Sequence, residues 1–339
     1  MVGRKRARIS DIMRMTGLSR STVDRVLNER PGVKEKTRKQ IEQAIAELGY
    51  APSSLSLHQA AQSARIEVFL PEGTNPFFAH LRNGIDAAAN AAAEQGVDLR
   101  ISGFDPYRPE TIVERLSAVN GHTTAVITVG VDNHEAGLAI NNLADRGIRV
   151  VTIVSDVPMS RRSAYVGQDN FVAGRTAGQL MASLVPPGPG RVAVLIGHPQ
   201  FRHLLDRQSG FQQALAISRP ELGVQACHPY GADPEQAAAI VRELMKDARN
   251  LRGVYLAGGG QPYLIDALRV TRGTQPVVIG HEVSDASRAA LRNGTYRLVV
   301  AHDVDELGKK AVNTALDRTV FGAQQCGVNI FIAENLPAV

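Results

Sequence analysis

The alternation of short apolar runs with amphipathic stretches, which begins at Ile66, is the feature that most constrains the fold of this chain. The candidate strands are Ile66–Leu70, Leu99–Ser102, Ala125–Val129, Arg149–Val154, Arg191–Ile196, Val224–His228, Gly253–Leu256, Val277–Gly280 and Arg297–Ala301. The candidate helices are Phe78–Gln95, Pro109–Val119, Ala173–Leu184, Pro234–Lys246 and Ser284–Asn293. Strands that alternate with helices predict parallel sheets with right-handed crossovers. So many strands favour two α/β lobes of one doubly wound design over a single open sheet.

The size and composition are typical of a folded protein with more than one domain. At roughly 100–200 residues per domain, 339 residues predict two or three domains, and 44% hydrophobic residues can supply their cores. No apolar run approaches the ~20 residues of a membrane-spanning helix, and no apolar stretch follows the basic amino terminus. Cys227 and Cys326 are too few for a disulfide framework or a zinc site. We therefore expect a soluble, cytoplasmic protein without a metal or a cofactor.

The positive charge is concentrated at the amino terminus. Residues 1–50 contain 12 Lys and Arg against 6 Asp and Glu, a net charge of +6, whereas the whole chain carries +5. These charges lie within a patterned, foldable stretch and do not form one block. A basic module on a near-neutral body favours contact with a polyanion, usually a nucleic acid. A solubilising basic tail is the alternative.

Three short helices are predicted in this basic stretch, over residues 9–15, 20–28 and 34–48. Ser10 or Asp11 is the expected N-cap of the first helix, and Gly17 ends it in a tight turn. Ser19 is the expected N-cap of the second. The apolar faces comprise Ile9, Ile12 and Met15 in the first helix, Val23, Val26 and Leu27 in the second, and Ile41, Ala44, Ile45 and Leu48 in the third.

This arrangement matches a helix-turn-helix module, an all-α unit whose second helix enters the major groove of DNA. The polar face of that helix is then the base-reading face. Arg20 and Arg25 can each donate two hydrogen bonds to a guanine edge, and Ser21 lies beside them. An ordinary solvated helix face is the alternative.

The run from Ile9 to Pro52 also resembles a known family. The shared positions are the Gly-hydrophobic-Ser turn at residues 17–19, Thr22-Val23, Arg25-Val26-Leu27-Asn28, Pro31-Gly32-Val33, Thr37-Arg38, and Leu48-Gly49-Tyr50 with Pro52. They are similar to the DNA-binding headpiece of the LacI family of bacterial transcription regulators. The resemblance implies base contacts by Arg20, Ser21 and Arg25. It also implies that Thr22, Asn28 and Ser10 position the sugar-phosphate backbone.

Residues 53–64 are the expected linker between a helix-turn-helix domain at 1–52 and a two-lobed ligand-binding and dimerisation domain at 65–339. In relatives of this family the linker forms a hinge helix that inserts a leucine into the minor groove and kinks the operator. Here Gln59 stands at the expected leucine position. A shifted wedge, a less bent operator and a linker that is disordered without operator all remain open.

The large domain resembles the periplasmic-binding-protein-like sensor domain of the same family, in the branch nearest to ribose-type sugar-binding proteins. The resemblance is carried by Thr74-Asn75-Pro76-Phe77-Phe78, by Val166-Gly167-Gln168-Asp169-Asn170 with Gly174 and Gly178, by Arg207 before Gly210-Phe211, and by Gly280-His281-Glu282. It implies a ligand in the cleft between the lobes, at the carboxyl ends of the strands.

A sugar site needs polar groups for hydroxyls and flat apolar surfaces for the C–H faces of the ring. The candidate ligand contacts are Asn75, Phe77, Phe78, Asp156, Arg207, His281, Glu282 and His302. Core packing is the alternative for one of the two phenylalanines, and an inter-lobe salt bridge is the alternative for Arg207. The triple glycine at 258–260 stands where ribose binders carry an amide side chain, so we do not expect the ligand to be held as ribose is.

An enzyme built on a doubly wound fold is the competing class. No GxGxxG motif follows a strand, no GxxxxGK[ST] or GxSxG motif is present, and the nine histidines show no metal-ligand spacing. The triple glycine at 258–260 can cradle a phosphate at a helix start, which is a weak signal. We therefore expect a sequence-specific transcriptional regulator, first of all a repressor, and not an enzyme.

The expected regulator is a homodimer, because one headpiece contacts few bases and a two-fold dimer reads a pseudo-palindromic operator. A small sugar, polyol or cyclitol bound between the lobes is expected to control its affinity for double-stranded operator DNA. No membrane partner is expected. The sequence leaves open the operator, the identity of the effector, and whether the effector releases DNA or promotes its binding.

Overall fold

The computed structural model describes residues 9–19, 22–23, 26, 33–48, 64–73, 75–93, 96–197, 199–225, 234–258, 261–269 and 275–337. The chain divides into two compact units, Met1–Gln62 and Ser63–Val339. The predicted linker lies outside the described residues except for Ala64, so its hinge helix and the role of Gln59 stay predictions.

The amino-terminal unit is helical in its described parts. They include α1 (Ile9–Thr16) and α3 (Glu35–Leu48), and Thr22, Val23 and Val26 are helical as well. The buried apolar residues are Ile12, Val23, Val26, Ile41 and Ala44. This core therefore draws on all three predicted helices. Gly17 follows α1 with a φ of +69°, a turn conformation that glycine adopts without steric cost.

Two details of the predicted first helix are wrong. The helix α1 already begins at Ile9, so Ser10 and Asp11 lie inside it and neither is the N-cap. Met15 is 47% exposed and does not join the core. The prediction for the next turn fits better, because the Ser19 hydroxyl accepts a hydrogen bond from the backbone N–H of Thr22 at 3.3 Å, as an N-cap does.

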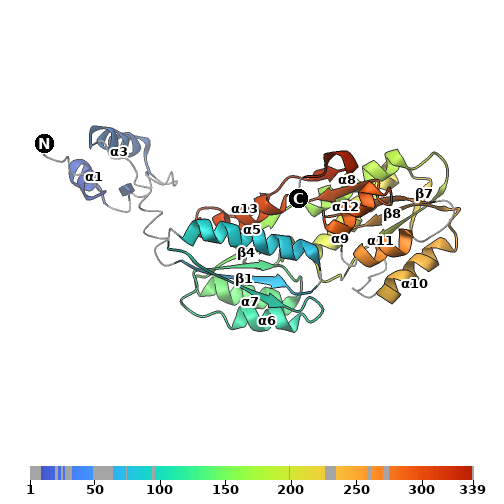
Figure 1. The fold of residues 1–339 in the computed structure, drawn as a ribbon. Helices are drawn as coiled ribbons and strands as arrows, with labels where there is room; N and C mark the ends of the chain where they lie inside the picture. Colours follow the sequence, from blue (N-terminus) through green and yellow to red (C-terminus); the bar gives the residue numbers. More distant parts are fainter. Residues whose placement is uncertain are drawn as a thin grey trace. The chain divides into compact units, whose positions relative to one another are not determined.

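The larger unit contains two six-stranded sheets, each the centre of one lobe (Figure 1). The first sheet has the order β11 (Gly322–Gln325), β5 (Ala164–Gly167), β4 (Arg149–Ile153), β3 (Ala125–Val129), β1 (Arg65–Pro71) and β2 (Asp98–Phe104). The second has the order β12 (Asn329–Phe331), β10 (Leu298–Ala301), β9 (Val277–His281), β8 (Leu251–Leu256), β6 (Gly190–Leu195) and β7 (Leu222–Gln225). All described strand pairs are parallel except β10 with β12.

Helices cover both faces of each sheet. Lobe 1 carries α5 (Pro76–Ala93), α6 (Glu110–Ser117), α7 (His134–Asp145) and α13 (Val304–Leu316). Figure 1 shows α5 and α13 on one face of its sheet and α6 and α7 on the other. Lobe 2 carries α8 (Asn170–Leu184), α9 (Arg202–Ser218), α10 (Pro234–Met245), α11 (Gln261–Arg269), α12 (Asp285–Arg292) and the short η1 (Ala333–Asn335). No helix in the described parts is long and apolar enough to span a membrane.

The predicted two-lobed parallel α/β fold is confirmed, because every candidate strand matches a strand of one of the two sheets. The strand predicted at Val224–His228 is β7, which begins earlier, at Leu222, and whose predicted last residues lie outside the described part. The strands β5, β11 and β12 and the helices α7, α9, α11 and α13 were not predicted. The three strands have only three or four residues each, and the sequences of β11 and β12 lack a continuous apolar run.

The chain passes between the lobes three times. The crossovers follow β5, β10 and β11, and they lead to α8, α13 and β12 respectively. The helix α13 returns to lobe 1, where it packs against α5. Three adjacent connections form a hinge between the two lobes.

Candidate functional site

A cavity of about 370 Å³ lies between the two lobes. Lobe 1 contributes Pro71, Glu72, Gly73, Asn75, Pro76, Phe77, Phe78, Pro106, Tyr107 and Val154 to its lining. Lobe 2 contributes Gly197, Phe201, His203, Leu204, Arg207, Gly258, Pro262, Tyr263, His281, Glu282, Val283 and Ser284. These residues follow the carboxyl ends of β1, β2 and β4 in one lobe and of β6, β8 and β9 in the other. The cavity is therefore where doubly wound sheets bind ligands.

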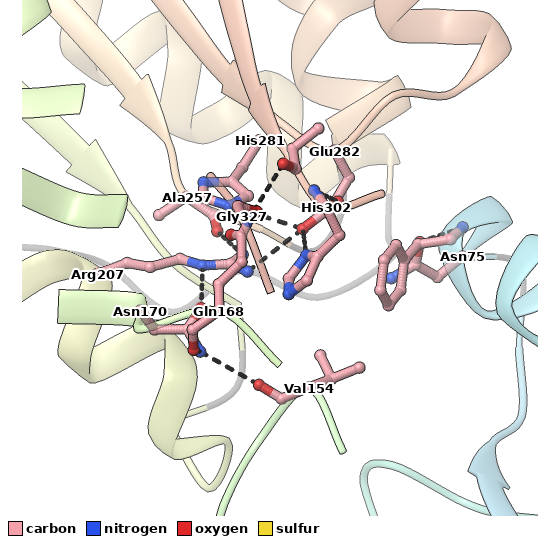
Figure 2. A network of polar contacts seen from close by, with 12 residues as sticks. Asn75, Val154, Gln168, Asn170, Arg207, Ala257, His281, Glu282, His302 and Gly327 are labelled. Carbon is pink, nitrogen blue, oxygen red and sulfur yellow. Dashed lines mark hydrogen bonds and ion pairs between the residues drawn. The ribbon is translucent and has the colours of Figure 1, made fainter. Parts of the chain in front are cut away.

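Arg207 lies at the base of the cavity with its side chain only 2% exposed. Its Nε donates to Oδ1 of Asn170 at 2.8 Å, its Nη1 to the carbonyl oxygen of Ala257 at 2.9 Å, and its Nη2 to Oε1 of Glu282 at 3.3 Å (Figure 2). Close packing of α8 on α9 sets this position, because a Cβ at Gly174 would lie 2.0 Å from the carbonyl oxygen of Arg207. The buried cation is thus compensated by a carboxylate and two neutral acceptors.

Glu282 follows β9 with a φ of +69°, which is uncommon for a residue other than glycine. Its Oε1 lies 2.7 Å from Nδ1 of His302, and its Oε2 accepts the backbone N–H of His302 at 3.1 Å (Figure 2). Burial acts to raise the pKa of Glu282, but the charge and hydrogen bond of His302, followed by His281 and Arg207, hold that pKa far below its usual range. Glu282 is therefore an ionised carboxylate that is already satisfied within the protein.

His281 is the last residue of β9 and is fully buried. Its Nδ1 lies 2.9 Å from the hydroxyl of Tyr255, whose ring stacks on Phe211 at 4.8 Å between centroids. Burial, with a smaller effect of Arg207, moves the pKa of His281 well below its ordinary value. The imidazole is thus neutral. Tyr255, on the neighbouring strand β8, fixes the orientation of the ring through this contact.

Aromatic rings form the apolar part of the cavity. The rings of Phe77 and Phe78 meet edge to face at 5.2 Å, and the ring of Phe77 lies 5.6 Å from that of His302. On the side of lobe 2, Phe201 lies 5.9 Å from His203. Such surfaces suit the C–H faces of a sugar ring, while the polar base suits hydroxyls.

Most of the predicted ligand residues are brought together by the fold. Those that line the cavity are Asn75, Phe77, Phe78, Arg207, His281 and Glu282. His302 is not in the lining, but it contacts both Phe77 and Glu282 at the edge of the cavity. Phe77 is both a core residue and a lining residue, since it is buried in the cluster around the first sheet.

Two interpretations of polar residues need correction. The structure does not bring Asp156 to the cavity, because its carboxylate is held inside lobe 1 by Arg162, with Arg162 Nη2 at 2.6 Å, and by Thr152 Oγ1 at 2.7 Å. The salt bridge of Arg207 is real but does not join the lobes, since Glu282 belongs to lobe 2 as Arg207 does. The Asn75 oxygen is also engaged, because it accepts the backbone N–H of Phe77 at 3.1 Å.

Several lining residues were missed by the sequence analysis, above all Phe201, His203 and Tyr263. They lie on or next to α9 and α11, two helices that were not predicted. A signal was present for one of them, since His203 precedes Arg207 by four residues and so shares its side of a helix.

The predicted DNA contacts lie largely outside the described residues. This applies to Arg20, Ser21, Arg25 and Asn28. The backbone of Ser10 lies in α1, but its side chain is not described. Thr22 is half-buried, with its hydroxyl 2.9 Å from that of Ser19. The base-reading face therefore stays a prediction.

Comparison with known proteins identifies both units. The family of bacterial regulatory proteins named lacI matches residues 8–53, and the periplasmic binding protein domain family matches residues 66–321. The regulator DegA of Bacillus subtilis strain 168, described as an HTH-type transcriptional regulator, is 26% identical over 213 residues. That alignment covers 61% of this chain and 60% of DegA, so it spans less than two thirds of the relative.

Another HTH-type transcriptional regulator, GntR of Escherichia coli strain K12, is 27% identical over 260 residues, which are 74% of this chain and 73% of GntR. Among solved structures, GanP of Geobacillus stearothermophilus, described as a glucose-galactose binding protein, is similar with a TM-score of 0.72 and 26% identity. That match covers 81% of this chain and 99% of GanP. With a lacI headpiece followed by a periplasmic binding protein domain, the chain belongs to the LacI family of bacterial regulatory proteins.

Proposed function

We propose that the protein is a sequence-specific repressor of transcription whose affinity for operator DNA is controlled by a small sugar, polyol or cyclitol bound between its two lobes. The observation that carries this proposal is the cavity at the hinge, where a compensated Arg207–Glu282 pair lies opposite the ring of Phe77. Family membership and the names of DegA and GntR support the regulatory role. The name of GanP supports a sugar as the ligand.

The three crossovers provide the mechanical basis for control. A ligand that contacts both lobes stabilises one lobe arrangement over others by the difference of its contacts in each. A coupling of about 1–3 kcal/mol between the ligand site and the DNA site is sufficient for a switch of 5- to 150-fold in affinity. The linker at residues 53–64 is the segment through which a change in the lobes would reach the headpiece.

The finer parts of the proposal follow from DNA recognition. A homodimer presents two headpieces to a pseudo-palindromic operator, with Arg20, Ser21 and Arg25 at the base edges and Ser10, Thr22 and Asn28 at the backbone. A protein that binds bacterial operators acts in the cytoplasm, without a membrane partner. An enzymatic role finds no support in the relatives, which are named as transcriptional regulators.

The proposal is tested by selecting binding sites from random duplexes with the full-length protein and then titrating sugars into the complex. We expect a pseudo-palindromic consensus, a dimer on each site, and a change in affinity of at least tenfold with one sugar, polyol or cyclitol. The same preparation is assayed for turnover of sugars and sugar phosphates. If the protein turns over one of these compounds and binds no specific DNA sequence, it is an enzyme and the proposed regulatory function is wrong.

A further inference from the structure

His203 lines the cavity but was not among the predicted ligand contacts. It lies in the first turn of α9, one helical turn before Arg207, and its side chain lines the cavity. It is 9% exposed, and its ring lies 5.9 Å from that of Phe201. This combination places a polar ring beside an apolar one at the ligand surface.

The Nδ1 atom of His203 is buried and makes no hydrogen bond with any described residue. Burial moves the pKa of His203 well below its ordinary value, with smaller effects of Arg207 and His302, so the ring is neutral. A neutral imidazole carries one donor and one acceptor. An unpaired polar atom next to a cavity is costly for the protein alone and is satisfied when a ligand supplies the missing group.

A second buried ring nitrogen without a partner belongs to His302, which lies at the edge of the cavity and not in its lining. Its Nδ1 lies 2.7 Å from Oε1 of Glu282, and because a carboxylate only accepts, that Nδ1 carries a proton. The opposite ring nitrogen, Nε2, is buried with no hydrogen bond to the described part of the chain. Figure 2 shows this Nε2 directed away from Glu282.

Each charged group of the described lining is either paired within the protein or negatively charged. Arg207 is its only described Lys or Arg, and this cation is paired with Glu282. Glu72 adds a further exposed carboxyl group at the side of lobe 1. An anionic ligand would therefore meet no unpaired cation, whereas a hydroxyl needs only a neutral donor or acceptor.

We propose that His203 reads hydroxyl groups of an uncharged polyhydroxylated ligand and thereby rejects sugar acids and sugar phosphates. The inference rests on the proposed function, since it concerns the same cavity. The Nδ1 atom of His203 is the group that pairs with a ligand hydroxyl, and the ring of Phe201 takes the adjoining C–H surface. His203 thus determines the specificity for the ligand, whereas Arg207 forms the polar floor of the cavity.

The test compares His203→Leu with His203→Asn in the full-length protein. Leu and Asn have the same shape, but only Asn keeps hydrogen-bonding atoms near the position of Nδ1. Binding is measured calorimetrically with D-ribose, D-arabinose, D-glucose, D-galactose and myo-inositol, and with the anions D-gluconate and D-ribose 5-phosphate. His122→Leu, which changes an exposed histidine far from the lining, is the matched control.

We expect one of the neutral compounds to bind wild type at least tenfold more tightly than either anion. For that compound, His203→Leu should lose about 10- to 100-fold in affinity, His203→Asn less, and His122→Leu nothing. Single-deoxy analogues then locate the contact, because one of them should bind wild type and His203→Leu equally. Equal losses for every analogue, or tighter binding of an anion, would overturn the inference.

A melting experiment without ligand separates recognition from packing. Since His203→Leu removes an unpaired buried polar atom, its melting temperature should equal or exceed that of wild type. A clearly lower value would assign His203 a structural role and overturn the inference. If a neutral compound binds as expected but leaves operator affinity unchanged, the proposed regulation fails while the reading role of His203 stands. If no neutral compound binds, both fail.

Discussion

The Nε2 atom of Gln168 lies 2.6 Å from the carbonyl oxygen of Ala301, and through this hydrogen bond the first crossover is tied to the second. The same Nε2 donates to the carbonyl oxygen of Gly327 at 3.0 Å, in the third crossover (Figure 2). The side chain is fully buried. One amide group thus holds the three connections of the hinge together.

Replacing Gln168 with Leu should loosen this hinge. The buried carbonyl oxygen of Ala301 and the part-buried one of Gly327 would lose their donor, and we expect the free energy of unfolding of the larger unit to fall by about 1–3 kcal/mol. The dependence of operator affinity on the effector should also weaken, because the lobes then have more than one stable arrangement. Urea unfolding and operator titrations measure the two effects. Gln324→Leu, on the exposed strand β11, serves as the control, and an equal effect there would refute a special role of Gln168.

Replacing Arg207 with Met should abolish the response to the effector and leave operator binding intact. The change leaves Glu282 buried without its cation, so we also expect a loss of about 3 kcal/mol in the free energy of unfolding. The double variant Arg207→Met/Glu282→Gln should be more stable than the sum of the single effects predicts, by about 1–3 kcal/mol. Simple additivity in urea unfolding would show that the pair is not coupled.

The contact of α8 with α9 predicts intolerance of a side chain at Gly174. An alanine Cβ there would lie 2.0 Å from the carbonyl oxygen of Arg207, so Gly174→Ala should cost more than about 2 kcal/mol and reduce ligand affinity. Gly137 lies within helix α7, where a Cβ would have its nearest neighbour at 4.0 Å. Gly137→Ala should therefore be neutral or stabilise by up to about 1 kcal/mol. Thermal unfolding and calorimetric titration distinguish the two variants.

Acid should destabilise the larger unit in two steps. His203 and His281 are neutral in the fold because burial lowers their pKa, whereas in the unfolded chain they bind protons below about pH 6.5. The free energy of unfolding should therefore be greatest above that pH and fall as the pH decreases, by up to about 1.4 kcal/mol per pH unit for each histidine. Glu282, whose folded pKa is lowered, adds a further loss below its ordinary value of 4.5.

Urea unfolding between pH 4 and 8 measures this profile. His281→Phe should flatten the part of the curve just below pH 6.5, because it removes one of the two groups that gain a proton on unfolding. Glu282→Gln should flatten only the most acidic part. A profile that rises toward acid, or that neither variant changes, would contradict the assignment of neutral histidines around an ionised carboxylate.

In the headpiece, replacing Arg25 with Ala should relax the preference at one position of the operator by about 1–3 kcal/mol. The expected cause is the loss of a two-fold hydrogen bond to a guanine edge. Binding to a set of operators with single substitutions measures it, with Lys39→Ala on the exposed side of α3 as the control. A uniform loss on every sequence would instead assign Arg25 to the phosphate backbone.

Much of the architecture follows from local pattern alone. Runs such as residues 125–129 and 149–153 are mainly apolar and buried at every position, as is typical of strands covered on both faces, and their alternation with helices favours parallel sheets. The three apolar faces at the amino terminus likewise meet in one core, because each helix has no other surface on which to bury them. For these parts of the fold, the spacing of hydrophobic residues along the chain is sufficient to predict the elements and the faces that they bury.

The site depended on contacts between distant parts of the chain. Arg207 meets Asn170, Ala257 and Glu282 only after β8 and β9 lie beside one another and α8 packs on α9. The tertiary structure also pairs Asp156 with Arg162 in an ion pair. It places His203 in the lining of the cavity with an unpaired ring nitrogen. The sequence by itself determined the two lobes and the headpiece, since hydrophobic periodicity is a local property. Only the tertiary structure decided which polar groups remain for a ligand, because pairing in a buried site depends on three-dimensional neighbours.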